Sequence, residues 1–458
     1  MTRDKTFYKS FFALYWALVL HQIITLSVNL LDNIMIGAFS EDALSGVATV
    51  NQIQFIFMSL VSGSGDALVA LGSQFWGQKD TKAVKQVASS ALLWGCGLGM
   101  VLFLLASIFP HQIVDIFTND PTVIAYGAEY LYTIRFTYVI FALSNLLLAT
   151  LRSVEAVKIG LWVSLTSLGI NVCLNYLLIF GNLGAPRMGV TGAAVATLVA
   201  RVAELLIVAW FVFCKDKKLH FRPKDTFCAG KTAFSLYMKS GWRFWLVSGM
   251  FGVSTALQTV ILGNMTKTAI AANSVASTLF QVLKVMAIGA ASASAVVIGK
   301  TLGEAKSEEE CLPKVKSYAK TLQVMYLIIG TVISVSLFLL RRPVLSLYTS
   351  LSPEAYEMAN QFILVLCLTG FGTAYQMPVL TGIVRGGGDS KFILYNDMIS
   401  IWCIVLPFSF LAAYRWHLHP ALVVLFLNAD QIFKCAAAAI KVNRFRWMKK
   451  IGAMHHDG

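Results

Sequence analysis

Charged side chains are scarce in this chain. Asp, Glu, Lys and Arg make up 13% of its 458 residues, whereas 57% of the residues are hydrophobic. Soluble domains contain roughly 25% charged residues. The apolar residues lie in long blocks, and the segments between the blocks are too short for a soluble domain of useful size. The composition therefore excludes an ordinary soluble protein and indicates a chain that spans a membrane.

Motifs of enzymatic and metal chemistry are also absent. The chain contains neither HExxH nor GxSxG, which disfavours an intramembrane enzyme, and we expect no enzyme activity. The cysteines show no CxxC spacing and most lie in apolar runs, which predicts small buried hydrophobic side chains. They are Cys96, Cys173, Cys214, Cys228, Cys311, Cys367, Cys403 and Cys435. We expect no cofactor, and no metal other than a sodium ion that the acidic site below could bind.

Twelve apolar blocks are long enough to cross a bilayer, since about 20 residues of helix span its hydrocarbon core of roughly 30 Å. We place them at 11–37, 47–71, 88–109, 126–150, 159–181, 188–213, 244–262, 270–298, 321–340, 355–384, 392–414 and 420–440. The predicted fold class is an all-α membrane protein. The first block is too long for a cleavable signal and lacks a small-residue cleavage site, so we expect it to remain as a helix.

Basic residues are distributed unequally between the two sides of these spans. With the N-terminus inside, the outside loops hold only five Lys and Arg residues, namely Arg187, Lys267, Arg341, Arg342 and Arg415. An excess of Lys and Arg marks cytoplasmic loops. We therefore predict an inner-membrane protein with both termini in the cytoplasm. The same pattern accounts for the net charge of +14 without a nucleic-acid partner.

A faint internal repeat divides the spans into two halves. GQKD at 77–80 matches GEAK at 303–306, and LRSVEAVK at 151–158 matches VRGGGDSK at 384–391. Equivalent loops lie on the same membrane side because six is an even number, so the halves are predicted to be parallel repeats. We predict two six-helix lobes around a central cleft, with an N-lobe at 1–213, a cytoplasmic linker at 214–243, and a C-lobe with a basic cytoplasmic tail at 244–458.

One acidic residue, Asp32, lies near the end of the first block. An ionisable group inside a span is costly and is a candidate functional site. Its carboxylate could bind a cation, and a low-dielectric cleft favours the neutral form, so Asp32 could also carry a proton. The alternative is a solvated acid at the helix end, because Gly37 follows five residues later. His21, in the same span, is interpreted as a hydrogen-bonded core histidine.

Five stretches occur in a characteristic order: LLDNIMIGAFSEDALSGVA (30–48), GSQFWGQKD (72–80), NYLLIFG (175–181), GVTGAAVATLVAR (189–201) and VRGGGDSK (384–391). Together they resemble the multidrug and toxic compound extrusion (MATE) family, in the bacterial group of NorM-like and DinF-like transporters. The resemblance covers nearly the whole chain. It implies two six-helix lobes in a V. It also implies export of organic cations and other amphipathic compounds, driven by inward sodium or proton flow.

The resemblance also implies a cation or proton site in the N-lobe, made by Asp32, Asn171, Asn175 and Thr197. Asn171 and Asn175 are one helical turn apart, so both carbonyls can face the same way. Carboxylate, amide and hydroxyl oxygens suit hard cations. Relatives often carry a second Asp where this chain has Asn175, so the site would hold a single negative charge. In the alternative interpretation, the asparagines form hydrogen bonds between helices.

Asp66, Gln258 and Lys284 are further candidates for the substrate cleft. Gln258 takes the place of Asp32 in the second half, and span seven has no Asp or Glu. We therefore expect the ion that drives transport to bind in the N-lobe rather than in the C-lobe. Asp66 either faces the cleft or forms a structural ion pair. An unpaired Lys284 would be costly in mid-span, and one prediction pairs it with Asp66. If Lys284 is alone in the cleft, it would favour anionic or zwitterionic substrates.

The other charges within the spans are interpreted as structural. We expect ion pairs between Arg201 and Glu204, and between Asp430 and Lys434, because each pair is three or four residues apart on one helix. Asp397, in span eleven, is either a relay acid or a helix-packing acid, and the structural interpretation is favoured.

These features predict a secondary antiporter, coupled to a cation or protons, that exports amphipathic and cationic drugs or metabolites by alternating access. Ion binding at Asp32 would change the bend or packing of the first span, which contains no proline. The alternative is a lipid-linked precursor flippase of the same superfamily, which would need a strongly cationic cleft. Only Lys284 and Arg201 point to such a cleft. A channel is disfavoured by the repeat. The expected partners are a small-molecule substrate and the lipid bilayer, with the chain as a monomer.

Overall fold

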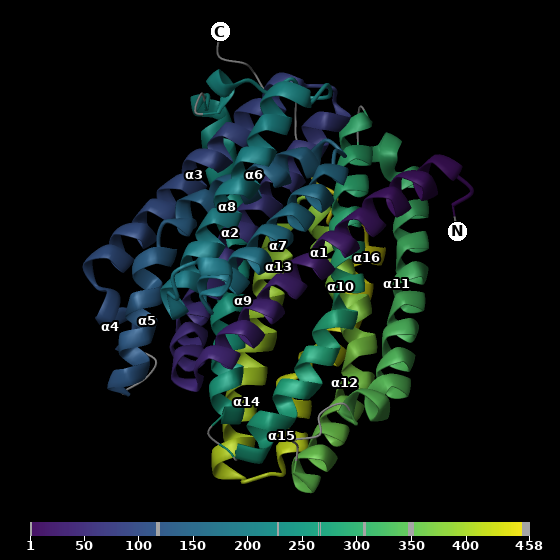
Figure 1. The fold of residues 1–458 in the computed structure, drawn as a ribbon. Coiled ribbons are helices and arrows are strands. Elements are labelled where there is room, and N and C mark those ends of the chain that lie inside the picture. The colour runs from purple at the N-terminus through teal and green to yellow at the C-terminus, as the bar shows by residue number, and fades with distance from the viewer. Residues whose placement is uncertain are drawn as a thin grey trace. The chain divides into compact units, whose positions relative to one another are not determined.

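The computed structural model describes residues 2–115, 120–226, 229–263, 265, 267–305, 308–346 and 352–450. Nearly all of these residues are helical, and no strand occurs among them (Figure 1). The prediction of an all-α protein is confirmed. Cys228, Lys306 and the last eight residues of the predicted basic tail lie outside the described residues.

Eleven helices of the described part are long and apolar enough to cross a membrane, and one bent pair supplies a twelfth span. The α-helices from which these spans and the shorter segments are built are α1 (Lys5–Phe39), α2 (Glu41–Gly77), α3 (Thr81–Ile108), α4 (Pro110–Asp115), α5 (Pro121–Ile134), α6 (Thr137–Ser153), α7 (Lys158–Leu178), α8 (Gly189–Trp210), α9 (Lys231–Gly263), α10 (Lys267–Glu304), α11 (Glu308–Leu345), α12 (Pro353–Met377), α13 (Ser390–Asp397), α14 (Leu406–Phe410), α15 (Pro420–Leu427) and α16 (Asp430–Asn443). Stretches of π-helix continue α8 and α12, and link α13 to α14. Each of the twelve predicted spans corresponds to one of these helices or joined helices.

The fourth predicted span, 126–150, is not a single straight helix. It consists of α5 and α6, which are bent by 53°. Arg135 lies at the bend, where its guanidinium carbon is 4.0 Å from the centre of the Tyr132 ring and 5.1 Å from that of Phe136. Such cation–π contacts stabilise a charge away from water. Hydropathy alone did not reveal this bend.

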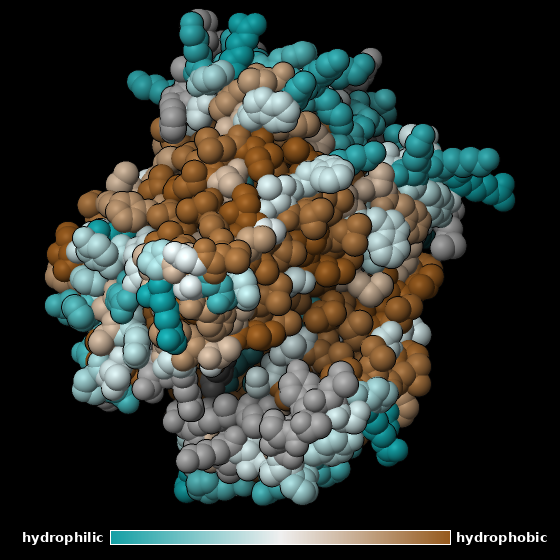
Figure 2. Space-filling model, in the orientation of Figure 1, coloured by the Kyte–Doolittle hydropathy of each residue, from teal (hydrophilic) through white to brown (hydrophobic). Residues whose placement is uncertain are grey.

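Helices such as α3 expose their apolar side chains. Met100, Val101, Leu104, Leu105 and Ile108 are all exposed, and Figure 2 shows many apolar side chains on the surface. An exposed row of apolar side chains along a helix is typical of contact with lipid. The prediction that the cysteines are buried is wrong for three of them. Cys173, Cys214 and Cys403 are exposed, as other apolar side chains of the spans are.

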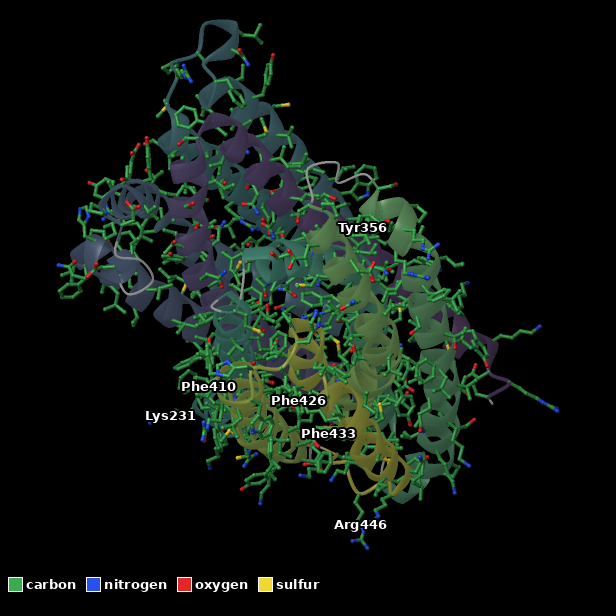
Figure 3. All side chains as sticks on the ribbon, turned by 90° about the horizontal axis from the view of Figure 1, so that it is seen from below. Lys231, Tyr356, Phe410, Phe426, Phe433 and Arg446 are labelled. Atoms are coloured by element: carbon green, nitrogen blue, oxygen red, sulfur yellow. The ribbon has the colours of Figure 1, made fainter. Side chains whose placement is uncertain are left out.

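The chain forms two compact units. Of the described residues, the first unit comprises those in 2–19, 73–79 and 250–450, and the second comprises those in 20–72 and 80–249. In the first unit, α10, α11 and α12 pack together around a core that includes Ile333, Leu337 and Phe362. Its last helices carry Phe410, Phe426 and Phe433 (Figure 3). In the second unit, α6 lies beside α3 and α8, and α7 packs on α8.

The run VRGGGDSK is fixed by the C-terminal segment of the same unit. Asp389 is buried, and its carboxylate is 2.7 Å from Lys441 Nζ and 2.8 Å from Lys449 Nζ. Burial raises the pKa of Asp389, but the hydrogen bonds from the two lysines outweigh this effect and leave its pKa below the ordinary value. A side chain at Gly387 would collide with the buried ring of Trp447. The glycines therefore allow the two segments to approach closely.

Gly192 allows α8 to approach the end of α7. A Cβ atom at this position would lie 2.7 Å from the Leu178 carbonyl oxygen. We expect Gly192→Ala to lower the free energy of unfolding by about 1–3 kcal/mol, because the two backbones must move apart. Thermal unfolding of the purified protein would measure this loss.

Gly169→Ala, on the exposed side of α7, is the matched control. An added Cβ there has no atom within 4 Å, so the variant should be as stable as the natural protein or slightly more stable. Equal stabilities of the two variants would contradict a tight α7–α8 contact.

Candidate functional site

One face of α1 lines a cavity of about 200 Å³ in the second unit. The side chains that it contributes include His21, Thr25, Asn29, Asp32 and Ile36. Steps of three and four residues place side chains on one face of a helix, so this spacing is what builds the polar stripe. The remaining walls come from α2, α5, α6, α7 and α8. All of the lining residues belong to the second unit.

A chain of hydrogen bonds connects the four residues of the predicted ion site. The Asn175 side-chain amide donates to Asp32 Oδ1 at 2.5 Å and to Asn171 Oδ1 at 3.2 Å. Asn171 in turn donates to Thr197 Oγ1 at 3.4 Å. The structure therefore brings all four residues together, from α1, α7 and α8.

The side-chain carbonyl of Asn175 is the exceptional group in this chain of hydrogen bonds. Asn175 is fully buried, and its Oδ1 accepts no hydrogen bond from any residue that the structure describes. A buried polar atom without a partner is costly and needs an explanation. The same chain of hydrogen bonds contains the Asp32 carboxylate and the Thr197 hydroxyl, which are further oxygen ligands. This donor set suits a hard monovalent cation, and the carboxylate alone suits a proton.

The surroundings of Asp32 help to decide whether it is an ion or proton site or a solvated acid at the end of a helix. Its side chain is half-buried, lines the cavity and is bonded to Asn175, seven residues before α1 ends at Phe39. A solvated acid at a helix end would not need a buried amide partner. The geometry therefore favours the site interpretation, whereas ion binding itself stays a prediction.

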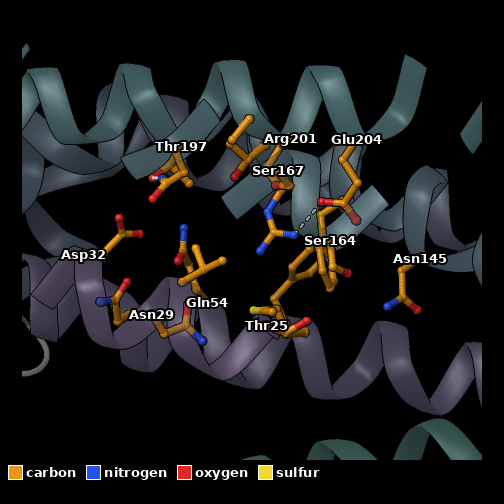
Figure 4. A pocket seen from close by; sticks show the side chains of 18 of the residues that line it. Thr25, Asn29, Asp32, Gln54, Asn145, Ser164, Ser167, Thr197, Arg201 and Glu204 are labelled. Atoms are coloured by element: carbon orange, nitrogen blue, oxygen red, sulfur yellow. Dashed lines mark hydrogen bonds and ion pairs between the residues drawn. The ribbon is translucent and has the colours of Figure 1, made fainter. Parts of the chain in front are cut away.

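The other end of the cavity contains an ion pair (Figure 4). Arg201 Nη1 donates to Glu204 Oε2 at 2.8 Å, which confirms the predicted pair. Glu204 is buried and accepts a second hydrogen bond from Ser144. His21 Nδ1 lies 3.2 Å from the Gly160 carbonyl oxygen and 2.5 Å from Ser164 Oγ, as expected of a hydrogen-bonded histidine.

Several cavity residues were missed by the sequence analysis. Asn29, Asn51, Gln54, Asn145 and Ser167 all line the cavity. Each is a polar residue within an apolar block, which is the available sequence signal. That signal does not distinguish a cavity-facing residue from one that bonds to its own helix.

The three cleft candidates lie elsewhere. Asp66 Oδ1 is 3.6 Å from Arg152 Nη2, which fits the structural ion pair rather than a free cleft acid. Gln258 and Lys284 belong to the first unit, where the Lys284 ammonium is 5.7 Å from the centre of the Phe251 ring. None of the three lines the cavity described above. The pairing of Asp66 with Lys284 would join the two units and stays a prediction.

The first unit contains a buried cluster of charges on α13 and α16. Lys434 Nζ lies 3.0 Å from Asp430 Oδ2, so this predicted pair is confirmed. It also lies 2.8 Å from Asp397 Oδ1, which gives that acid the structural partner that the sequence did not name. A hydrogen bond from Gln431 to Asp430 extends the cluster.

Comparison with known proteins decides the family. The MatE family model matches residues 17–177 and 243–411. The chain belongs to the MatE family. A probable multidrug resistance protein NorM of Halalkalibacterium halodurans is 25% identical over 413 residues, covering 88% of this chain and 87% of the relative. The multidrug resistance protein MdtK of Photorhabdus laumondii is 22% identical and covers 96% of each chain.

Solved structures agree on the fold of this MatE protein. A transporter of the MOP superfamily from Pyrococcus furiosus superimposes with a TM-score of 0.85 at 16% identity, covering 96% of this chain and 95% of the other. A mutant of the Vibrio cholerae MATE transporter VcmN gives 0.83 at 18% identity, covering 96% of this chain and 97% of the other. The family match, the multidrug resistance relatives and the long apolar helices together make the protein a multi-pass membrane transporter of the MATE family.

Proposed function

We propose that this protein is a secondary antiporter that exports amphipathic, cationic drugs or metabolites and is driven by sodium or protons bound at Asp32. The observation that carries the proposal is the Asp32 carboxylate in the cavity, bonded to the amide of a buried Asn175 whose carbonyl oxygen has no partner in the described part of the chain. A bound cation would satisfy both oxygens. A proton on Asp32 would instead remove its charge.

The charges of the cavity suit a cationic substrate before the coupling ion binds. Asp32 and Glu204 carry negative charge and Arg201 carries positive charge, which gives a net charge of −1. Phe57, Met58 and other apolar side chains in the wall can repack around varied ligands. Binding of the coupling ion cancels the remaining charge and weakens the attraction for the substrate.

Alternating access requires that the coupling ion bind the two states unequally. Asp32 must therefore be solvated differently in each. Because α1 contains no proline from Lys5 to Phe39, any change in its bend must come from the packing of neighbouring helices. We further propose a monomer in the inner membrane with both termini in the cytoplasm, on the distribution of basic residues.

A flippase for lipid-linked precursors would need a strongly cationic cavity. Arg201 is already neutralised by Glu204, and the cavity as a whole is acidic. The geometry therefore favours the antiporter.

Purified protein in liposomes tests the proposal. A fluorescent organic cation is loaded inside, and inward sodium and pH gradients are imposed separately. We expect one gradient to accelerate efflux and the other to have little effect. If the rate of efflux is the same with the sodium gradient, with the pH gradient and with no gradient, ion-coupled antiport is rejected.

A further inference from the structure

The first turns of α9, in the second unit, expose two lysines that no acidic side chain neutralises. Lys231 and Lys239 are both exposed, and among the described residues neither forms an ion pair or a hydrogen bond. A hollow in the surface runs along this stretch and is lined by Lys231, Thr232, Ser235, Leu236 and Lys239. The hollow therefore combines two positive charges with the hydroxyl groups of two further side chains.

The same face of α9 becomes apolar farther along the helix. Steps of three and four residues lead from Lys239 to Trp242 and on to Leu246, and both of these side chains are exposed. With 33 residues α9 is about 50 Å long, whereas the hydrocarbon core of a bilayer is roughly 30 Å thick. Its first turns therefore extend into the layer of lipid headgroups, and Trp242 takes the boundary position at which tryptophan is enriched.

We propose that this face of α9 binds one anionic phospholipid, with its phosphate group between Lys231 and Lys239 and an acyl chain along Trp242 and Leu246. The proposal goes beyond the proposed function and does not depend on it. Ammonium groups and hydroxyls donate hydrogen bonds to phosphate oxygens, and basic side chains near the membrane surface attract anionic lipids. The cationic headgroup of phosphatidylcholine would instead be repelled by the two lysines.

The opposite face of α9 is fixed within the second unit. Ala233 and Tyr237 are fully buried, and the Tyr237 hydroxyl donates to the Ser64 carbonyl oxygen of α2 at 3.1 Å. A Cβ atom at Gly63 would lie 2.7 Å from the Phe244 carbonyl oxygen, so the backbones of α2 and α9 are in close contact. The lipid-binding face is thus held in one orientation, and binding orders side chains only, which keeps the entropic cost of binding small.

Native mass spectrometry of the purified full-length protein in detergent tests the site. The probes are phosphatidylglycerol and phosphatidylcholine with identical acyl chains, and a titration with each gives the dissociation constant of the first bound lipid. The test variant is Lys231→Gln/Lys239→Gln. The matched control is Lys217→Gln/Lys224→Gln, which removes the same charge from two exposed lysines of the linker that precedes α9.

We expect the natural protein to bind phosphatidylglycerol about tenfold or more tightly than phosphatidylcholine, because each lysine near the headgroups strengthens the attraction severalfold. In the test variant this preference should fall below about threefold, and in the control it should stay unchanged. Phosphatidylglycerol should also raise the melting temperature of the natural protein and of the control, since a ligand that binds only the folded state stabilises it. The test variant should lose most of this increase.

A preference for phosphatidylglycerol that falls equally in the test variant and the control would overturn the site, because total charge and not these two lysines would then attract the lipid. An unchanged preference in the test variant, or no preference in the natural protein, would also overturn it. Glycerol phosphate provides a further arm. If it displaces phosphatidylglycerol at the same concentration, the hollow binds a soluble phosphate compound instead of a lipid. None of these measurements uses an ion gradient or an exported compound, so their failure leaves the proposed antiport unaffected.

Discussion

Asp32→Asn is expected to lower ion-driven efflux by more than about tenfold, because an amide neither carries negative charge nor exchanges a proton near neutral pH. The substitution preserves the size of the side chain, and its carbonyl oxygen can still accept the hydrogen bond from Asn175. The protein should therefore fold and insert normally. Efflux from liposomes under the driving gradient, together with drug resistance of a sensitive host, measures the effect.

The control for this variant is Asp120→Asn. Asp120 accepts hydrogen bonds from the backbone at the start of α5, and asparagine caps helices about as well as aspartate. It should therefore transport like the natural protein. Normal coupled efflux by Asp32→Asn would remove Asp32 from the mechanism. Loss of efflux together with a lowered melting temperature would point to misfolding instead of lost coupling.

Lys434→Met is expected to destabilise the protein by about 3–5 kcal/mol, because it leaves the charges of Asp397 and Asp430 without their cation. The Lys434 and Asp430 side chains are 4% and 5% exposed, so water cannot replace the cation at Asp430. The Asp397 side chain is 26% exposed and contributes less to the loss. The free energy of unfolding in detergent, from thermal or denaturant unfolding of the purified variant, measures the loss.

A second variant separates charge from packing. Lys434→Met combined with Asp397→Asn and Asp430→Asn removes all three charges and should recover most of the lost stability. Lys314→Met is the matched control, since Lys314 forms an exposed ion pair with Glu304 at 3.5 Å. Its loss should cost less than about 1 kcal/mol. A Lys434→Met protein as stable as this control would contradict a structural role for the cluster.

The sequence was sufficient for the fold class because membrane spans depend on length and hydropathy, which a single chain displays directly. All twelve predicted blocks became helices. The bend between α5 and α6 was not predictable, since neither proline nor glycine marks it and only the fold brings the Phe103 ring to 5.7 Å from the Arg135 guanidinium carbon. Burial of cysteines was overestimated because apolar residues in a membrane can face lipid as well as a core.

The residues of the candidate site were predicted for two different reasons. Asp32 stands out by itself, as an acid within an apolar block. Asn171, Asn175 and Thr197 came from the family resemblance, and the hydrogen bonds between them show that they lie together. The second partner of Lys434 was missed because Asp397 and Lys434 are 37 residues apart, and sequence spacing predicts only pairs on one helix.

The contacts of Asp389 with Lys449, and of Gly387 with the indole of Trp447, have a practical consequence for handling the protein. A purification tag or fluorescent reporter joined directly after Asn443 would displace a tryptophan that is fully enclosed. Such fusions should begin beyond residue 450, or be placed at the opposite end of the chain.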